Sequence, residues 1–318
     1  MIAAIYAGLA ALLAGVVPGA DARTTVVVVV GAPGTPEYGG RFAGWADRWK
    51  QACARADAQL TVVGLDGGAT PDKDRLAEVL AREGARPQGE LWLVLLGHGT
   101  FDGRTAKFNL RGADVAADEL AKWLAPVRRP LVVIDAAPAS APFVKALSGP
   151  DRVIVTATRS GREQNATRFG GFFADAIADP LADLDKDGQT SLLEAFLVAA
   201  KHVDASYSEA GLLATEHALI DDNGDGLGTG AGLYQGLRPG KPDSNAPVDG
   251  RRAHQLHLVP SEPEKAMPPE LRRRRDQLEL QVLQLRDGRA KLNEDDYYRR
   301  MEPLLLELAR LYQRAEKR

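Results

Sequence analysis

The sequence is poor in cysteine, in methionine and in net charge. Its 318 residues include one cysteine, Cys53, and three methionines. A single cysteine can form neither an intrachain disulfide nor a cysteine metal cluster. Three methionines are too few for the Met-rich groove of a calcium-dependent switch. Lysine and arginine (40) nearly balance aspartate and glutamate (43), leaving a net charge of -3. Since no basic field favours nucleic acid, we expect no nucleic-acid partner.

Long apolar runs are also scarce, and the main one lies at the N-terminus. Residues 1–22 are rich in alanine and leucine and end in Ala20-Asp21-Ala22. An Ala-x-Ala ending is typical of signal peptidase cleavage, here before Arg23. The run is short for a membrane span. We therefore expect a signal peptide over 1–22, export to the periplasm or the extracellular space, and no stable membrane span after cleavage. A retained N-terminal anchor is the alternative.

What remains alternates between apolar strands and amphipathic helices. Short apolar runs at 24–31, 60–63, 91–96, 131–134 and 153–158 indicate strands, because each is bounded by turn-forming residues. The runs are uninterrupted, as in strands buried on both faces. Helical stripes lie between them. This alternation predicts right-handed crossovers, and hence an α/β domain over 23–235 with a mainly parallel central sheet between two layers of helices.

One helical stripe explains the lone cysteine. Phe42, Trp45, Trp49 and Cys53 follow each other at spacings of three and four residues. Such spacing places them on one apolar helix face. Free cysteine is among the most buried residue types. We therefore interpret Cys53 as a small core residue and not as a displaced nucleophile.

Two strand ends carry residues that suit a site. The run 91–96 is followed by Gly97-His98-Gly99, and the run 131–134 is followed by Asp135. Ligands and catalytic groups in open α/β sheets gather beyond the carboxyl ends of the strands. Glycines on both sides of His98 leave its imidazole and backbone accessible. These two strand ends are the predicted centre of the molecule.

The order of these motifs resembles the caspase, legumain and gingipain clan of cysteine peptidases. Legumains carry EACESGSMF after the second strand, where this chain has DAAPASAPF over 135–143. The resemblance covers roughly Thr24 to Tyr234. It implies a caspase-like three-layer sandwich, with His98 at the position of the catalytic histidine and Ala137 at that of the catalytic cysteine.

That resemblance implies an inactive site. In the family, the cysteine thiolate attacks the peptide carbonyl, and the histidine supplies a proton to the leaving amine. Alanine has no nucleophilic atom. In other proteases, removing the nucleophile costs on the order of 10⁶ in kcat. We therefore expect a pseudopeptidase that retains His98 and Ala137 as a degenerate pair. An active peptidase of the same fold that uses another nucleophile, such as Ser140, is the alternative.

The strongest local motif is an EF-hand-type loop over 183–194. Its sequence, DLDKDGQTSLLE, places side-chain oxygens at positions 1, 3, 5 and 12 and glycine at position 6. Ca²⁺ takes roughly six to eight oxygen ligands, and carboxylates this close together repel each other without a cation. We predict a structural calcium site with the ligands Asp183, Asp185, Asp187, Gln189 through its backbone carbonyl, and Glu194.

A second acidic stretch, 221–226, has only the first half of such a loop. It supplies Asp221, Asn223 and Asp225, but position 12 falls on Gly232, so the bidentate acid is missing. These three residues are candidate calcium ligands, either at a site of their own or lent to the first site. A simple turn is the other interpretation.

The C-terminal part differs in composition. Residues 236–269 are rich in proline, glycine, aspartate and serine, which predicts an extended linker. Leucine stripes on either side of Asp287-Gly288 predict an antiparallel helical hairpin over 270–318. The function expected from the whole sequence is an exported, inactive caspase/legumain-like domain that binds calcium and a peptide or protein ligand. Its rivals are the active peptidase and a scaffold acting through the C-terminal helices.

Overall fold

The computed structural model describes residues 23–240 and 249–316. The predicted signal peptide therefore lies outside the described residues. Seven strands form the central sheet in the order β10-β9-β8-β7-β3-β1-β2, and five of them are parallel. The parallel strands are β1 (Thr25–Val30), β2 (Gln59–Val63), β3 (Leu91–Leu96), β7 (Leu131–Asp135) and β8 (Arg152–Thr156), and the antiparallel edge holds β9 (Leu219–Asp221) and β10 (Thr229–Gly230).

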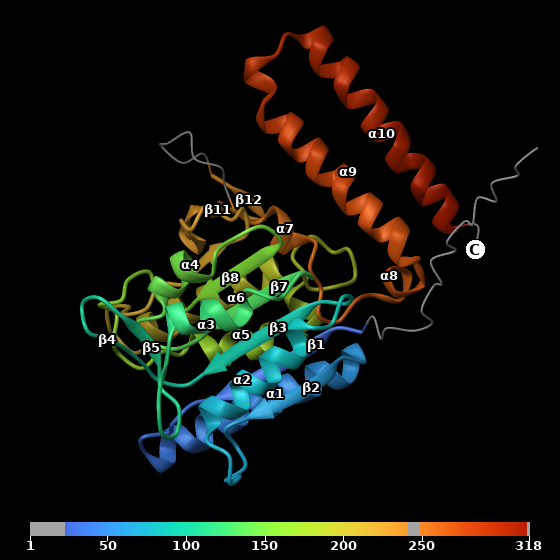
Figure 1. Ribbon diagram of the computed structural model, residues 1–318. Helices are drawn as coiled ribbons and strands as arrows, with labels where there is room; N and C mark the ends of the chain where they lie inside the picture. The colour runs from blue at the N-terminus through green and yellow to red at the C-terminus, as the bar shows by residue number, and fades with distance from the viewer. Residues whose placement is uncertain (1–22, 241–248, 317–318) are drawn as a thin grey trace, which may run out of the picture.

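Helices cover both faces of this sheet (Figure 1). Alternation along β1 shows how the two faces divide. Val26 and Val28 point into one core, and Val27 and Val29 point into the other, because successive strand residues face opposite sides. The first core is closed by α1 (Pro36–Ala56), α5 (Phe169–Ala176) and α6 (Leu192–Glu209), and the second by α2 (Asp72–Gly84), α3 (Ala117–Leu124) and α4 (Ala141–Leu147).

The three-layer α/β class expected from the sequence is thereby confirmed. Among the described residues, two small sheets and two 3-10 turns lie in the loops of this domain, and a third 3-10 turn lies between the last two helices. They are β4 (Gly99–Phe101), β5 (Ala106–Phe108) and β6 (Val115–Ala116); β11 (Tyr234–Gln235) and β12 (Arg238–Pro239); and η1 (Pro180–Ala182), η2 (Ala231–Leu233) and η3 (Arg289–Lys291).

The predicted linker is more structured than its composition suggests. Two short helices lie in its described part, α7 (Arg251–His254) and α8 (Glu262–Ala266). Ala253 and Leu258 are 0% and 2% exposed and belong to the first core. Burial of these two side chains anchors the segment, so the chain after 249 follows the surface of the sheet domain and does not extend into solvent.

The C-terminal hairpin consists of α9 (Pro269–Asp287) and α10 (Glu294–Glu316), as expected (Figure 1). It has a small core of its own that includes Leu278, Leu311 and Met267. Contacts to the rest of the molecule include the side-chain amide of Gln255, just after α7, which donates to the Asp276 carbonyl at 2.9 Å, and the ion pair between Glu264 of α8 and Arg275 of α9. None of the described helices combines the length and the apolar character needed to cross a membrane.

Candidate functional site

The two strand ends singled out in the sequence lie side by side. Strands β3 and β7 are parallel neighbours with Leu95 opposite Asp135, and the Ala136 amide donates to the Leu95 carbonyl at 3.0 Å. The loops that follow also touch, because a Cβ on Gly99 would lie 2.2 Å from the Pro138 carbonyl oxygen. Only glycine fits such a close approach of two backbones. The structure therefore brings the His98 loop and the Ala137 loop together.

The His98 ring is held on the side of β1 and α1. Its Nε2 lies 3.2 Å from the Pro33 carbonyl oxygen. Tyr38 and Phe42 contact the ring edge to face, with centroids 4.7 and 5.2 Å away. Because a carbonyl can only accept, this contact makes Nε2 the protonated nitrogen. His98 is thus fixed by aromatic packing and by one backbone contact.

Ala137 is a buried methyl group. It is 1% exposed and belongs to the second core, and its Cβ would lie 3.3 Å from a Cβ on Gly99. Its amide donates to Oδ1 of Asp135 at 3.1 Å. At this position the chain offers packing and no reactive atom.

Asp135 is the unusual titratable group beside this position. It is 1% exposed, and its Oδ2 has no hydrogen-bond partner in the described structure. Burial raises the pKa of the Asp135 carboxyl to about 7, although the hydrogen bond from the Ala137 amide opposes the shift. The carboxyl group at the end of β7 therefore stays protonated at pH values where an ordinary aspartate is ionised.

The hydroxyl of Ser140, the alternative nucleophile, is hydrogen-bonded to Thr158. Its hydroxyl lies 3.1 Å from the Thr158 hydroxyl and accepts the Thr158 amide at 3.2 Å. Ser140 is 1% exposed. A hydroxyl bonded in this way ties α4 to the end of β8. The geometry thus gives no support to a serine nucleophile.

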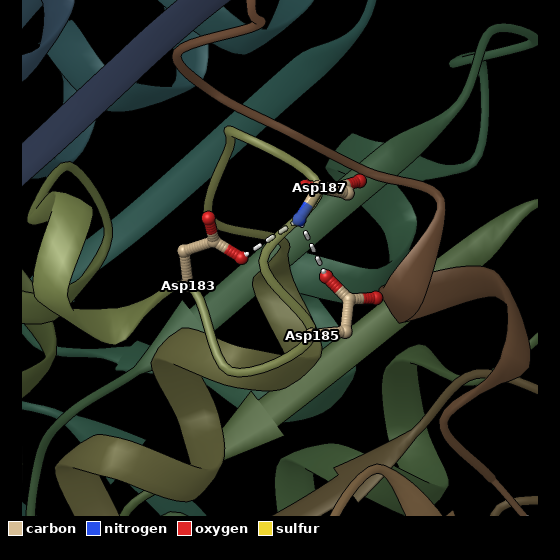
Figure 2. Close-up of side chains that lie close together, drawn as sticks. All are labelled: Asp183, Asp185 and Asp187. Carbon is tan, nitrogen blue, oxygen red and sulfur yellow. Dashed lines mark hydrogen bonds between the residues drawn. The ribbon is translucent and has the colours of Figure 1, made fainter.

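The first acidic loop brings three of its acidic side chains together. Carboxylate oxygens of Asp183, Asp185 and Asp187 all lie within 4.8 Å of one another. Figure 2 shows the Asp187 amide between two of them, 3.2 Å from Asp183 and 3.3 Å from Asp185. Lys186 and Gly188 have φ values of 64° and 92°, a backbone conformation that lets the loop turn tightly. Three hard oxygen donors therefore converge, which fits Ca²⁺.

Glu194 is placed differently from the expected bidentate ligand. Its Oε1 accepts the amides of Leu184 at 2.7 Å and Asp185 at 3.2 Å. Its Oε2 accepts the amide and the hydroxyl of Ser191, completing the capping box that begins α6. Glu194 therefore holds the start of the loop through its backbone amides. The group of three converging carboxylates among the described residues does not include Glu194.

Partners from the C-terminal segment reach this loop, and sequence reasoning missed them. His254 Nε2 lies 2.9 Å from Oδ2 of Asp185, and the Ser261 amide donates to the Gln189 side-chain oxygen at 3.0 Å. No acidic residue lies within four positions of His254 along the chain, and its partner Asp185 is 69 residues away. No local pattern signals a contact of that kind.

The second acidic loop is a self-capped turn joined by a distant acid. Both oxygens of Asp221 accept loop amides, from Gly224 and Gly226 at 3.0 Å each. Asn223 and Asp225 each accept the amide two residues on. Asp249, which the sequence did not point to, accepts the amides of Asp222 and Asn223. Burial raises the pKa of Asp249 to about 7. Within the described chain, this loop does not form a second group of three converging acidic or histidine ligands.

Comparisons with known proteins give similarity of fold. No protein-family model matches the sequence, and no curated protein matches it. Solved structures that resemble the chain include the Drosophila initiator caspase Dronc, with 13% identity, a TM-score of 0.41, and coverage of 66% of this chain and 82% of Dronc. Caspase-1 from Spodoptera frugiperda has 9% identity and a TM-score of 0.40, covering 63% of this chain and 86% of the caspase.

A bacterial structure matches to the same degree. Protein GSU0716 from Geobacter sulfurreducens has 11% identity and a TM-score of 0.41, covering 65% of this chain and 97% of that one.

Proposed function

We propose that this chain is an exported, catalytically inactive caspase-like domain that binds a peptide or protein ligand and is stabilised by a calcium ion in the 183–194 loop. The observation that carries the first part is the buried Ala137 methyl group, which lies at the end of β7 where the resemblance expects a cysteine. His98 is retained on the adjacent strand end but has nothing to activate.

The proposed calcium ion acts as a clip between the ends of the loop. Asp183 leads into the loop from η1, and Glu194 belongs to the first turn of α6. A cation among Asp183, Asp185 and Asp187 would offset the repulsion between their carboxylates and fix this turn. When bound, Ca²⁺ supplies charge and coordination. The residues supply the oxygens and, through the amides that Glu194 accepts, the shape of the loop.

A fluorogenic peptide panel tests the inactive site. Substrates with Arg, Lys, Asn or Asp at the cleaved position are incubated with the wild type, His98→Ala and Ser140→Ala, each in calcium and in chelator. The proposal expects the same background signal from all three proteins. Turnover that is lost in His98→Ala would show an active enzyme, and loss in Ser140→Ala as well would name the nucleophile.

A second function is favoured by the surface of the hairpin. Three large apolar side chains of α10 are about half exposed: Tyr298 (53%), Leu305 (50%) and Leu306 (49%). Aromatic and leucine side chains on an open helix face suit a helical partner. Removing residues 268–318 separates the two functions. Peptide binding that survives the deletion belongs to the sheet domain, and binding that is lost belongs to the hairpin.

Export is tested on the mature N-terminus. The proposal expects a protein recovered from outside the cytoplasm to begin at Arg23, as the Ala20-Asp21-Ala22 ending predicts. An intact Met1 on the exported protein would instead identify residues 1–22 as a retained anchor.

A further inference from the structure

A cavity of about 340 Å³ lies beside the carboxyl end of β8. Its walls are mostly apolar: Ala200 and Val203 come from α6, Phe169 begins α5, and Leu219 belongs to β9. Ala157, the first residue after β8, also lines it. The volume is within the range of small-ligand sites, roughly 300 to 1,000 Å³. Beyond the end of a parallel strand is also where open α/β sheets bind ligands.

One polar side chain in the wall is held in a defined orientation. His217 lines the cavity, and its Nδ1 lies 2.6 Å from Oε1 of Glu163, which is outside the lining. A carboxylate only accepts hydrogen bonds, so Nδ1 is the donor of this pair, and in the singly protonated ring Nε2 is an acceptor. Glu163 is itself fixed, because its Oε2 accepts the Arg159 amide at 2.9 Å. The ring therefore lies between a fixed carboxylate and the cavity.

Two acids line the wall, and the buried one, Glu216, already has hydrogen-bond partners. Glu216 is 1% exposed, and its oxygens accept the amides of Arg168 and Phe169 at 2.8 to 3.1 Å, which caps the start of α5. Arg159 is neutralised by Glu163, with Nε 3.3 Å from Oε1. The remaining acid of the lining, Asp204 of α6, is exposed to solvent. Because most of the wall is apolar, it suits an apolar group that carries one hydrogen-bond donor.

We propose that this cavity binds an apolar side chain of a peptide, whose backbone N–H donates to Nε2 of His217. The proposal rests on the peptide-binding function above and names the side-chain class that the domain selects. Two lining residues, Ala157 and Arg159, flank Thr158, whose hydroxyl lies 3.1 Å from that of Ser140 in the loop after β7. Glu163 is a positioning residue that acts through the His217 ring.

Capped amino acids are the probes, measured by ligand-observed and protein-observed NMR on the full chain. N-acetyl-leucinamide and N-acetyl-phenylalaninamide carry the apolar group and the amide donor, and N-acetylglycinamide carries only the donor. Burying a leucine side chain predicts at least about tenfold tighter binding than the glycine probe. His217→Phe should weaken leucine-probe binding about tenfold, and His217→Gln, which keeps an acceptor, should restore part of it.

Two variants fill the cavity. Gly232→Trp adds a ring at the rim, where a Cβ meets nothing within 4 Å, so the fold tolerates it. Ala200→Phe fills the wall from α6. Both should abolish binding of the leucine probe. Leu181→Ala is the matched control, because Leu181 is 84% exposed and does not line the cavity. Equal affinity for the glycine and leucine probes, or full leucine binding in Gly232→Trp, overturns the proposal.

Failure here is distinguishable from failure of the peptide-binding function. If longer peptides bind the wild type and Gly232→Trp equally, the cavity claim is wrong and the peptide-binding function stands. If no longer peptide binds, but the leucine probe binds the wild type and not Gly232→Trp, the cavity claim stands and the peptide-binding function is wrong.

Discussion

Asp185→Asn should remove about half of the calcium stabilisation without weakening the calcium-free protein. Asp185 is exposed, and its structural roles are to accept the Asp187 amide at 3.3 Å and to contact His254. An asparagine oxygen can accept in the same way. What the substitution removes is one negative charge from a group of three carboxylates that lie within 4.8 Å. The substitution therefore tests cation binding while the hydrogen bonds of the loop are kept.

The expected magnitudes follow from that geometry. Each carboxylate pair at 4.8 Å or less repels by at least about 0.9 kcal/mol even in a water-like dielectric, so the variant in chelator should be at least as stable as the wild type. Calcium at 100-fold its dissociation constant stabilises the wild type by about 2.7 kcal/mol, or roughly 5 to 11 °C in Tm for a domain of this class. A tenfold weaker site keeps only about 1.4 kcal/mol at the same calcium concentration.

Thermal melts with calcium and with chelator measure both quantities, and Asp225→Asn is the matched control. Asp225 accepts the amide two residues on, at 2.8 Å, as Asp185 does, but it lies in the second loop. The control should keep the full calcium shift. An equal shift in Asp185→Asn and the wild type would refute calcium binding at the first loop. A shift lost only in Asp225→Asn would move the site to the second loop.

Other predictions concern stability and architecture. Asp135 has a pKa of about 7 in the fold, against 3.8 ordinarily. The stability that its neutral form contributes to the fold is therefore fully present below about pH 4 and is lost as pH rises through 7. The loss is on the order of 4 kcal/mol. In urea melts at a series of pH values, the free energy of unfolding of Asp135→Asn should therefore change less above about pH 4 than that of the wild type. Arg129→Ala should cost about 3 to 5 kcal/mol in urea melts, because it leaves the Glu83 carboxylate without its buried partner; a loss below 1 kcal/mol would contradict this. Residues 23–267 should fold cooperatively without the hairpin, whose core cluster takes only Met267 from these residues; loss of near-ultraviolet circular dichroism would show otherwise.

The sheet was predictable where burial on both faces leaves an apolar run. Strands β1, β3 and β7 are such runs, and the structure places each within a residue or two of its predicted bounds. The edge strands β9 and β10 have three and two residues, too few to show any periodicity. The segment after 249 looked like a linker because its composition is polar. Its anchors are two small contacts, Ala253 and Leu258, that only the folded core reveals.

The candidate site divides in the same way. The Asp183 loop was predictable, since its three converging carboxylates and its glycine lie within six consecutive residues. The unpaired oxygen of Asp135 and the Glu163–His217 pair were not, because their environments come from chain segments far apart in sequence. Glu194 shows what the sequence motif could not predict, because it caps α6. A carboxylate at the right position can serve as a helix cap as well as a ligand.

Ala137→Cys tests the degenerate site most directly. The variant is treated with peptidyl chloromethyl ketones, and the intact mass is measured with and without a second substitution, His98→Ala. The wild type measures the background from Cys53, which should be negligible because burial raises the pKa of the Cys53 thiol to about 12. If Ala137 holds the nucleophile position, a single adduct forms at residue 137 and its rate falls sharply without His98. No adduct, or an adduct that forms equally fast without His98, would contradict the account.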